Sequence, residues 1–164
     1  MKQHFTVAIL GAGGRGFIYA TLFHEREEFE VVAACDYKPQ QLEKMKNTFG
    51  FADDALFLDE EEFFKEKRAD VLAIATCDTD HVRQCVRAMK MGYDILLEKP
   101  ISDSREEIEE LLRVQKETGR NVVVCHVLRY ASAIWKLDEI LSSGVLGKLI
   151  AIDHIERVAF WHQA

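Results

Sequence analysis

A glycine-rich segment near the amino terminus has residue types and a spacing suited to binding phosphate. Residues 11–16 read Gly-Ala-Gly-Gly-Arg-Gly, follow an apolar run and open a segment with helical spacing. The first glycine permits a tight turn, the second lets the backbone approach a pyrophosphate, and the last lets helix and strand pack closely. N–H groups at the start of the helix then favour negative charge. We therefore expect a dinucleotide site that includes Gly11, Gly13, Gly14, Arg15 and Gly16.

An acidic residue lies at the distance along the chain that such a site requires. Asp36 ends the second apolar run, twenty residues after Gly16. Its carboxylate can accept hydrogen bonds from the adenosine ribose and would repel a 2′-phosphate. Lys38 weakens that preference, so the sequence predicts NAD as cofactor without excluding NADP. The structural alternative is a glycine-rich turn with an ordinary capping aspartate, but strand, helix and spaced acid together favour cofactor binding.

The elements that must position these residues alternate between strands and helices. Five apolar runs lack two-residue alternation, as strands covered on both faces of a parallel sheet do. They comprise residues 5–10, 31–35, 71–75, 95–97 and 122–125. Segments with helical spacing lie between them, at residues 14–25, 39–49, 60–66, 79–89 and 103–118. This order predicts an α/β fold with a doubly wound parallel sheet.

The helix expected at 103–118 has the clearest pattern. Ile108, Leu111, Leu112 and Gln115 fall on one face, which predicts that this face is buried. Ser104 followed by Glu107 is typical of a capping box, and Gly119 supplies a left-handed stop.

The last part of the chain has a different character. One more amphipathic helix, ended by Gly144 and Gly147, precedes an expected long strand from Leu149 to Trp161. Such a strand would leave an unpaired apolar edge, so we expect a fragment whose continuation would extend the sheet. We therefore expect a dinucleotide-binding domain at 1–128. Residues 129–164 would form the transition helix and first strand of a truncated second α+β domain.

Three motifs together resemble a known oxidoreductase family. They are the loop at 11–16, the segment from Thr76 to His81, and Glu98-Lys99-Pro100. The family is that of glucose-fructose oxidoreductase, inositol dehydrogenase and MocA-like proteins. Residues 129–148 are similar to its passage from the first domain into the second. The resemblance spans nearly the whole chain and implies an NAD(P)-binding Rossmann fold in an NAD(P)-dependent dehydrogenase.

The resemblance implies that Lys99 is the catalytic residue. At the carboxyl end of a central strand, its ammonium could donate a hydrogen bond to the reacting hydroxyl oxygen and relay a proton. The alternative is a solvated lysine that pairs with Glu98. The resemblance further implies a cis peptide bond between Lys99 and Pro100.

The same resemblance assigns Thr76, His81 and Glu98 to the cofactor site. His81 would lie near the nicotinamide end, whereas a partly exposed histidine without a role is the alternative. Cys77 stands where the family usually has proline, so the resemblance does not predict the conformation of this loop. We expect no catalytic cysteine, because His81 is the one nearby base in the sequence and the dehydrogenase reaction needs no thiol.

The implied reaction moves hydride between NAD and a secondary alcohol of a small-molecule substrate, such as a sugar or polyol. The family's usual acid-base aspartate and histidine lie beyond this chain, so the fragment should bind dinucleotide without turnover. Two alternatives stay open. One is an NAD-dependent glycosidase of the same family, and the other is a noncatalytic sensor that binds NAD.

Charge and composition exclude several classes of function. With 21 basic and 28 acidic residues the net charge is −7, and no basic stripe offers a site for nucleic acid. The apolar runs are too short to cross a membrane, and the amino terminus lacks a secretory signal, so we expect a cytoplasmic protein. The four cysteines show no C-x-x-C spacing, which argues against a metal site. Family resemblance implies a homo-oligomer for the full-length protein.

Overall fold

The computed structural model describes residues 4–157. The chain divides into two compact units, one ending at Cys125 and the other beginning at His126. Within the described residues six strands form one sheet, namely β1 (Phe5–Leu10), β2 (Phe29–Cys35), β3 (Leu56–Phe57), β4 (Val71–Ile74), β5 (Asp94–Leu97) and β6 (Val122–Val124). The first unit also holds helices α1 (Gly14–His24), α2 (Pro39–Phe49), α3 (Glu60–Phe63), α4 (His81–Lys90) and α5 (Arg105–Thr118).

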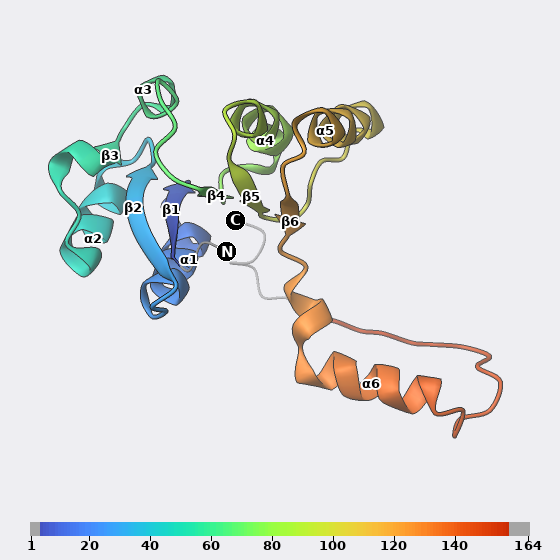
Figure 1. Cartoon of the computed structure of the whole chain (residues 1–164). Helices are drawn as coiled ribbons and strands as arrows, with labels where there is room; N and C mark the ends of the chain where they lie inside the picture. The colour runs from blue at the N-terminus through green and yellow to red at the C-terminus, as the bar shows by residue number, and fades with distance from the viewer. Residues whose placement is uncertain (1–3, 158–164) are drawn as a thin grey trace. The chain divides into compact units, whose positions relative to one another are not determined.

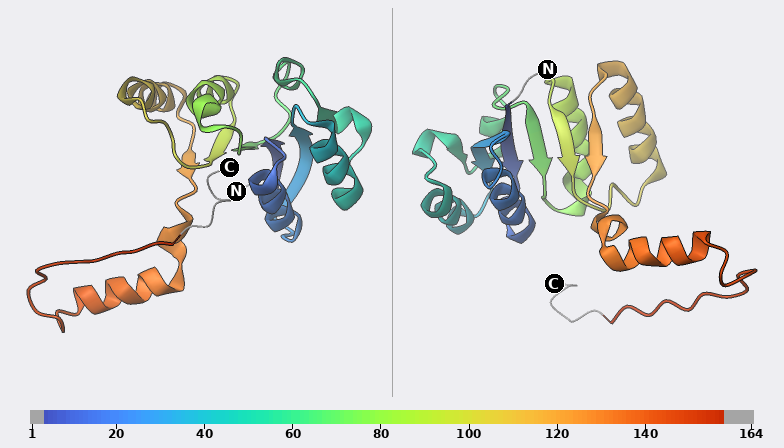
Figure 2. Two further views of the ribbon diagram at one scale, coloured as in Figure 1. Left: turned by 180° about the vertical axis from the view of Figure 1, so that it is seen from behind. Right: turned by 60° about the horizontal axis from the view of Figure 1, so that its bottom comes forward.

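The sheet is parallel throughout, and its strand order is β3-β2-β1-β4-β5-β6 (Figures 1 and 2). The direction of winding reverses between β1 and β4. In doubly wound sheets ligands bind outside the carboxyl ends of the strands at this reversal. The predicted fold class is confirmed, and the sheet has the strand order of a classical dinucleotide-binding fold.

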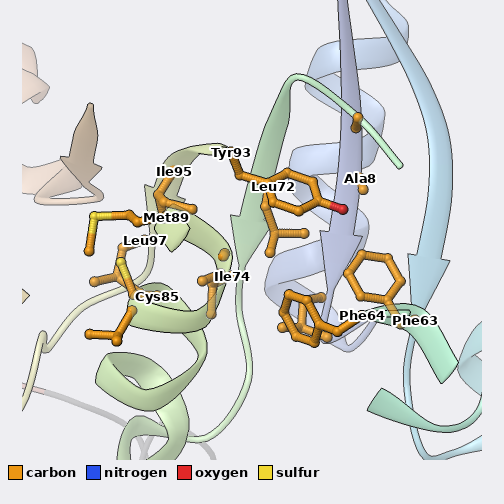
Figure 3. Packing of buried hydrophobic residues seen from close by; sticks show 14 of the residues in the cluster. Ala8, Phe63, Phe64, Leu72, Ile74, Cys85, Met89, Tyr93, Ile95 and Leu97 are labelled. Atoms are coloured by element: carbon orange, nitrogen blue, oxygen red, sulfur yellow. The ribbon is translucent and has the colours of Figure 1, made fainter. Parts of the chain in front are cut away.

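Helices cover both faces of the sheet, as the continuous apolar strands require. On one face α1 and α2 pack against Val7, Ile9 and Ala34. On the other face α3, α4 and α5 pack against alternate strand residues such as Leu72 and Ile74. Figure 3 shows this second core, in which Phe63 at the end of α3, the following Phe64, and Cys85 and Met89 of α4 pack with the strand side chains. Each central strand therefore buries side chains on both sides.

Most elements of the first unit begin and end within two residues of the predicted bounds, and the exceptions are β3 and α3. The predicted strand at 5–10 and helix at 39–49 have the observed bounds, with Pro39 at the first helical turn. The strand β3 was missed because two residues are too few to show a pattern. The helix expected at 60–66 ends at Phe63, and residues Asp78–Asp80 form a 3₁₀ turn before α4.

Helix α5 confirms the predicted ends and corrects the predicted face. The Ser104 side chain accepts a hydrogen bond from the Glu107 amide at 3.3 Å, and Gly119 has a positive φ of 64°. Leu112 was expected to be buried but is 51% exposed, whereas Val114 is fully buried. The expected face is otherwise correct, since Leu111 is buried and Ile108 and Gln115 are partly buried; Leu112 lies at its edge, because the buried side of α5 is centred on Leu111 and Val114.

Removing the Ser104 hydroxyl should lower the stability of this unit. We expect Ser104→Ala to cost about 1 kcal/mol in the free energy of unfolding, because the Glu107 amide loses its cap. Ser104→Asp is the matched control, because its carboxylate keeps an acceptor for the Glu107 amide, and it should cost at most a few tenths of a kcal/mol. Urea unfolding followed by circular dichroism measures both. Equal losses in the two variants would contradict a capping role.

The second unit contains α6 (Ser132–Ser142) and a 3₁₀ turn at Val127–Tyr130. The long strand expected from Leu149 to Trp161 is wrong for residues 149–157, which form no strand. A strand needs a partner for its ladder of hydrogen bonds, and in the described residues this segment pairs with no other strand. Its last residues, 158–161, lie outside the described part. Among residues 4–157 no helix has both the length and the apolar character needed to span a membrane.

Candidate functional site

The strand register brings the predicted site residues to one edge of the sheet. Leu10 at the end of β1 lies beside Cys35 of β2 and Ile74 of β4. The segments after these strands therefore emerge next to one another. The Gly11 amide donates to the Cys35 carbonyl at 2.8 Å, and the Ala75 amide donates to the Leu10 carbonyl at 2.8 Å.

A pocket of about 320 Å³ lies at this edge. Gly11, Gly13, Asp36 and Thr76 line it, together with Cys77. Four predicted cofactor residues from three separate segments thus share one pocket. The other predicted residues do not line it, namely Gly14, Arg15, Gly16, His81, Glu98 and Lys99.

The glycines of the loop serve two different purposes. A Cβ on Gly16 would lie 1.9 Å from the Gly11 carbonyl oxygen, so only glycine lets α1 pack this closely on the loop. Gly11 has a φ of 87°, and a Cβ there would lie 2.6 Å from the Ala75 carbonyl oxygen. A Cβ on Gly13 or Gly14 would meet nothing within 4 Å. Backbone at Gly13 and Gly14 is therefore open to a ligand.

The start of α1 lacks the usual side-chain cap. Gly13 is the N-cap residue, and within the described residues no side chain bonds to it and no acidic residue occupies the first turn. The helix dipole and its first N–H groups are thus free to attract an anion. Bare glycine backbone and an uncapped helix end together fit the pyrophosphate of a dinucleotide.

Asp36 binds the glycine loop as well as facing the pocket. Its Oδ2 accepts a hydrogen bond from the Ala12 amide at 2.8 Å, and its Oδ1 accepts one from the Lys38 amide at 2.8 Å. The residue is 9% exposed. A carboxylate offers about four acceptor positions, so each oxygen retains one for a ribose hydroxyl. The contact with Ala12 was not predicted, because no local pattern indicates a bond across 24 residues.

Polar residues that the sequence did not single out complete the pocket. The Thr76 hydroxyl donates to Gln84 Oε1 at 2.6 Å, and the Gln84 amide donates to Glu60 Oε2 at 2.7 Å. Glu60 also accepts from the Arg83 guanidinium at 3.1 Å. Glu60 lies on α3 and Gln84 on α4, so spacing along the sequence gave no signal for their contact. The network fixes the Thr76 side chain at the pocket wall.

Glu98 joins the end of β5 to α1. Its side chain accepts a short hydrogen bond from the Tyr19 hydroxyl, and Arg15 Nε lies 3.4 Å from the same carboxylate. Its Oε2 accepts from the Lys99 amide at 2.9 Å. Glu98 is 5% exposed. Burial of the Tyr19 hydroxyl, together with the nearby Cys125 and Glu98, raises the pKa of Tyr19. This carboxylate therefore connects the helix that follows the glycine loop with the backbone of Lys99.

Lys99 is exposed directly after this buried carboxylate. Within the described residues its ammonium forms no hydrogen bond or ion pair. The ion pair with Glu98 that the alternative supposed does not form, because that carboxylate bonds Arg15, Tyr19 and the Lys99 backbone, whereas the lysine is exposed to solvent as the alternative supposed. The Lys99–Pro100 peptide bond is cis, as the resemblance implied.

His81 lies in the interior rather than at the surface. It is fully buried at the start of α4, and its Nδ1 is 2.7 Å from the Pro100 carbonyl oxygen. The alternative of a partly exposed histidine is therefore wrong. Its side chain was expected near the nicotinamide end, and the structure places its Nδ1 against the loop that carries Lys99 without making it part of the pocket lining.

Three of the four cysteines are buried, and the fourth, Cys77, is exposed. All four lie in the described part of the chain, and each is a free thiol. Burial raises the pKa of Cys35 and that of Cys85 to about 12, so both stay protonated. Cys77 is exposed and lines the pocket. In residues 4–157 no group of His, Cys, Asp or Glu residues is arranged to hold a metal ion.

Strand order, bare glycine loop and uncapped helix define this unit as a dinucleotide-binding Rossmann domain. Residues 5–126 match the Gfo/Idh/MocA family, described as an oxidoreductase family with an NAD-binding Rossmann fold. The chain belongs to this family, which confirms the resemblance and NAD as the family's cofactor.

Two relatives represent different activities. D-glucoside 3-dehydrogenase of Escherichia coli (strain K12) is 25% identical over 144 residues, which cover 87% of this chain and 40% of the relative. Glycosyl hydrolase family 109 protein 2 of Akkermansia muciniphila is 26% identical over 154 residues, covering 88% of this chain and 32% of the relative. This chain thus spans less than half the length of either.

A solved structure shows the same fold. Scyllo-inositol dehydrogenase from Lactobacillus casei, solved with bound NAD(H) and scyllo-inositol, superposes with a TM-score of 0.79. It is 22% identical, and the match covers 88% of this chain and 42% of the other.

Proposed function

We propose that this chain is the cofactor-binding part of an NAD-dependent oxidoreductase that acts on a secondary alcohol of a sugar or polyol. The observation that carries the proposal is the placement of Asp36 and Lys99 on opposite sides of the glycine loop. In strand order Asp36 follows β2, the loop follows β1, and Lys99 follows β5. Three strand spacings separate β2 from β5, about 14 Å.

A dinucleotide extended along this edge would make separate contacts at its two ends. Asp36 would bind the adenosine ribose, the amides at Gly13 and Gly14 the pyrophosphate, and Lys99 would face the reacting end. Thr76 lies between them at the end of β4. NAD, when bound, supplies the acceptor for a hydride. The substrate class is supported by the sugar and polyol names of the relatives.

Lys99 would act on the substrate oxygen. Its unpaired ammonium donates a hydrogen bond to the alcohol oxygen and stabilises negative charge that develops there. Because Glu98 bonds the Lys99 amide rather than the ammonium, the charge is not neutralised by its neighbour. The same ammonium can relay the hydroxyl proton toward solvent.

The chain by itself should bind NAD without turnover. It spans 40% of the length of the dehydrogenase relative, and the pocket in its first unit is lined by the residues that we assign to the cofactor. Binding to the 164-residue chain therefore tests the cofactor site apart from the reaction.

Calorimetric titration should show that NAD binds more tightly than NADP. The Asp36 carboxylate accepts from ribose hydroxyls and repels a 2′-phosphate, so we expect a preference of about tenfold or more. In Asp36→Ala the preference should fall toward one. The ratio of the two dissociation constants is the quantity to compare, because loss of the Asp36–Ala12 contact weakens the binding of NAD and NADP alike. Silent titrations with both ligands would contradict the cofactor site, and tighter NADP binding would contradict the role of Asp36.

An NAD-dependent glycosidase is a second candidate, favoured by the similarity to the glycosyl hydrolase of Akkermansia muciniphila. Such an enzyme would oxidise the sugar transiently and return the hydride. The two candidates differ in their products, since an oxidoreductase accumulates NADH in proportion to the oxidised alcohol. A glycosidase releases sugar with no net change in NAD.

A further inference from the structure

The contact between His81 and Pro100 defines the state of a buried imidazole. The Pro100 carbonyl oxygen can only accept a hydrogen bond, so His81 Nδ1 must carry a proton and donate across the 2.7 Å distance. His81 Nε2 is buried and lacks a hydrogen-bond partner within the described residues. A proton on Nε2 would create a charged ring with an unsatisfied buried donor, which is costly. The ring is therefore neutral, with its proton on Nδ1.

The residues around Lys99 lack the support of regular secondary structure. β5 ends at Leu97 and α5 begins at Arg105, so the loop between them belongs to neither element. On the amino side of Lys99, the Glu98 amide donates to the Ile74 carbonyl at 2.9 Å. The Lys99 amide itself donates to Glu98 Oε2 at 2.9 Å.

On the carboxyl side of Lys99, the His81 imidazole holds the Pro100 carbonyl. The backbone of Lys99 is thus fastened on both sides, while its ammonium stays free. His81 can do this from the interior because α4 packs against β4 and β5. The histidine neither lines the cofactor pocket nor reaches solvent.

We propose that His81 is a positioning residue for Lys99, acting through the Pro100 carbonyl rather than through the cofactor. The inference rests on the proposed role of Lys99 in hydride transfer. Neutral imidazole suits the task, since a donor is needed in an apolar interior that disfavours charge. Lys99 then presents its ammonium from a fixed backbone.

Two variants of the 164-residue chain separate the hydrogen bond from the volume of the ring. In His81→Asn the side-chain amide nitrogen takes the place of Nδ1 and keeps a donor. In His81→Leu a side chain fills the space without a donor. Amide hydrogen exchange is measured by NMR at Glu98 and Lys99, whose amides both donate hydrogen bonds, with Ile9 in β1 as the internal reference.

We expect exchange at Glu98 and Lys99 to accelerate about tenfold in His81→Leu, the loss of one hydrogen bond, while Ile9 is unchanged. In His81→Asn the rates should stay within about threefold of the original chain. Equal acceleration in both variants, or equal acceleration at Ile9, would overturn the proposal. If the leucine variant does not fold, nitrogen chemical shifts of His81 in the unaltered chain still decide, because a proton on Nε2 contradicts the assignment.

Turnover by the full-length enzyme provides the functional readout. His81→Leu should lower kcat by about 10²-fold while KM for NAD stays near its original value, and His81→Asn should recover most of kcat. A rise in KM for NAD with unchanged kcat would instead indicate cofactor contact and would overturn the proposal. Failure of the proposed function is seen separately, because Lys99→Ala would then retain turnover whatever the exchange rates show.

Discussion

Substituting alanine for Gly16 is expected to destabilise the domain by about 2–3 kcal/mol and to weaken NAD binding at least about tenfold. The added Cβ would lie 1.9 Å from the Gly11 carbonyl oxygen. This oxygen belongs to the backbone of a buried turn, so the clash is relieved only if α1 moves away from the loop. Such movement also displaces the helix N-terminus from the pyrophosphate. Urea unfolding and calorimetric titration of the same variant measure both effects.

Gly13→Ala is the matched control within the same loop. Its Cβ would meet nothing within 4 Å and its φ of −64° suits any residue, so stability should change by less than about 0.5 kcal/mol. NAD affinity should nevertheless fall, because the added methyl group would lie where the pyrophosphate is proposed to approach the backbone. A Gly16→Ala variant as stable as Gly13→Ala would contradict the close packing of α1. Unchanged NAD affinity in Gly13→Ala would contradict the placement of the pyrophosphate.

Local pattern was sufficient to predict the sheet. Apolar runs such as residues 5–10 and 71–75 are continuous because helices cover both faces, and this property is visible in the sequence alone. β3 could not be predicted from the sequence, because its two residues form a strand only through their pairing with Ala34 and Cys35 and have no pattern of their own. On α5 the prediction failed only at the edge of the buried face. Helical spacing placed Leu111 correctly, but it did not show whether Leu112 or Val114 completes the face, because that depends on where the neighbouring elements lie.

The candidate site was predictable where chemistry is encoded within a few residues. The loop at 11–16 and the spacing to Asp36 were enough to predict that Gly11, Gly13 and Asp36 lie at one pocket. The second role of Asp36, binding the Ala12 amide, was not, because it depends on strand register. Contacts made by Glu98 with Tyr19, and by His81 with Pro100, likewise join segments that only the fold brings together.

In the full-length enzyme, Lys99→Ala should lower kcat by about 10²- to 10⁴-fold, the range typical of a lost acid-base group. NAD affinity and thermal stability should hardly change. The physical reason is that the ammonium is exposed and, within the described residues, unpaired. The contacts that organise the loop use the Lys99 amide, which alanine retains. Stopped-flow measurement of NADH formation, with calorimetry for NAD, tests both parts.

Lys116→Ala supplies the control for loss of a positive charge. Lys116 is exposed in the last turn of α5, so its removal should leave kcat within about twofold of the original value. If Lys99→Ala retains both turnover and NAD affinity, the ammonium does not serve the reaction. If the full-length protein has no turnover in either form but binds NAD, a noncatalytic sensor fits better. A loss of NAD affinity that matches the loss of kcat would assign Lys99 to cofactor binding, because a group that acts only on the alcohol oxygen leaves cofactor affinity intact.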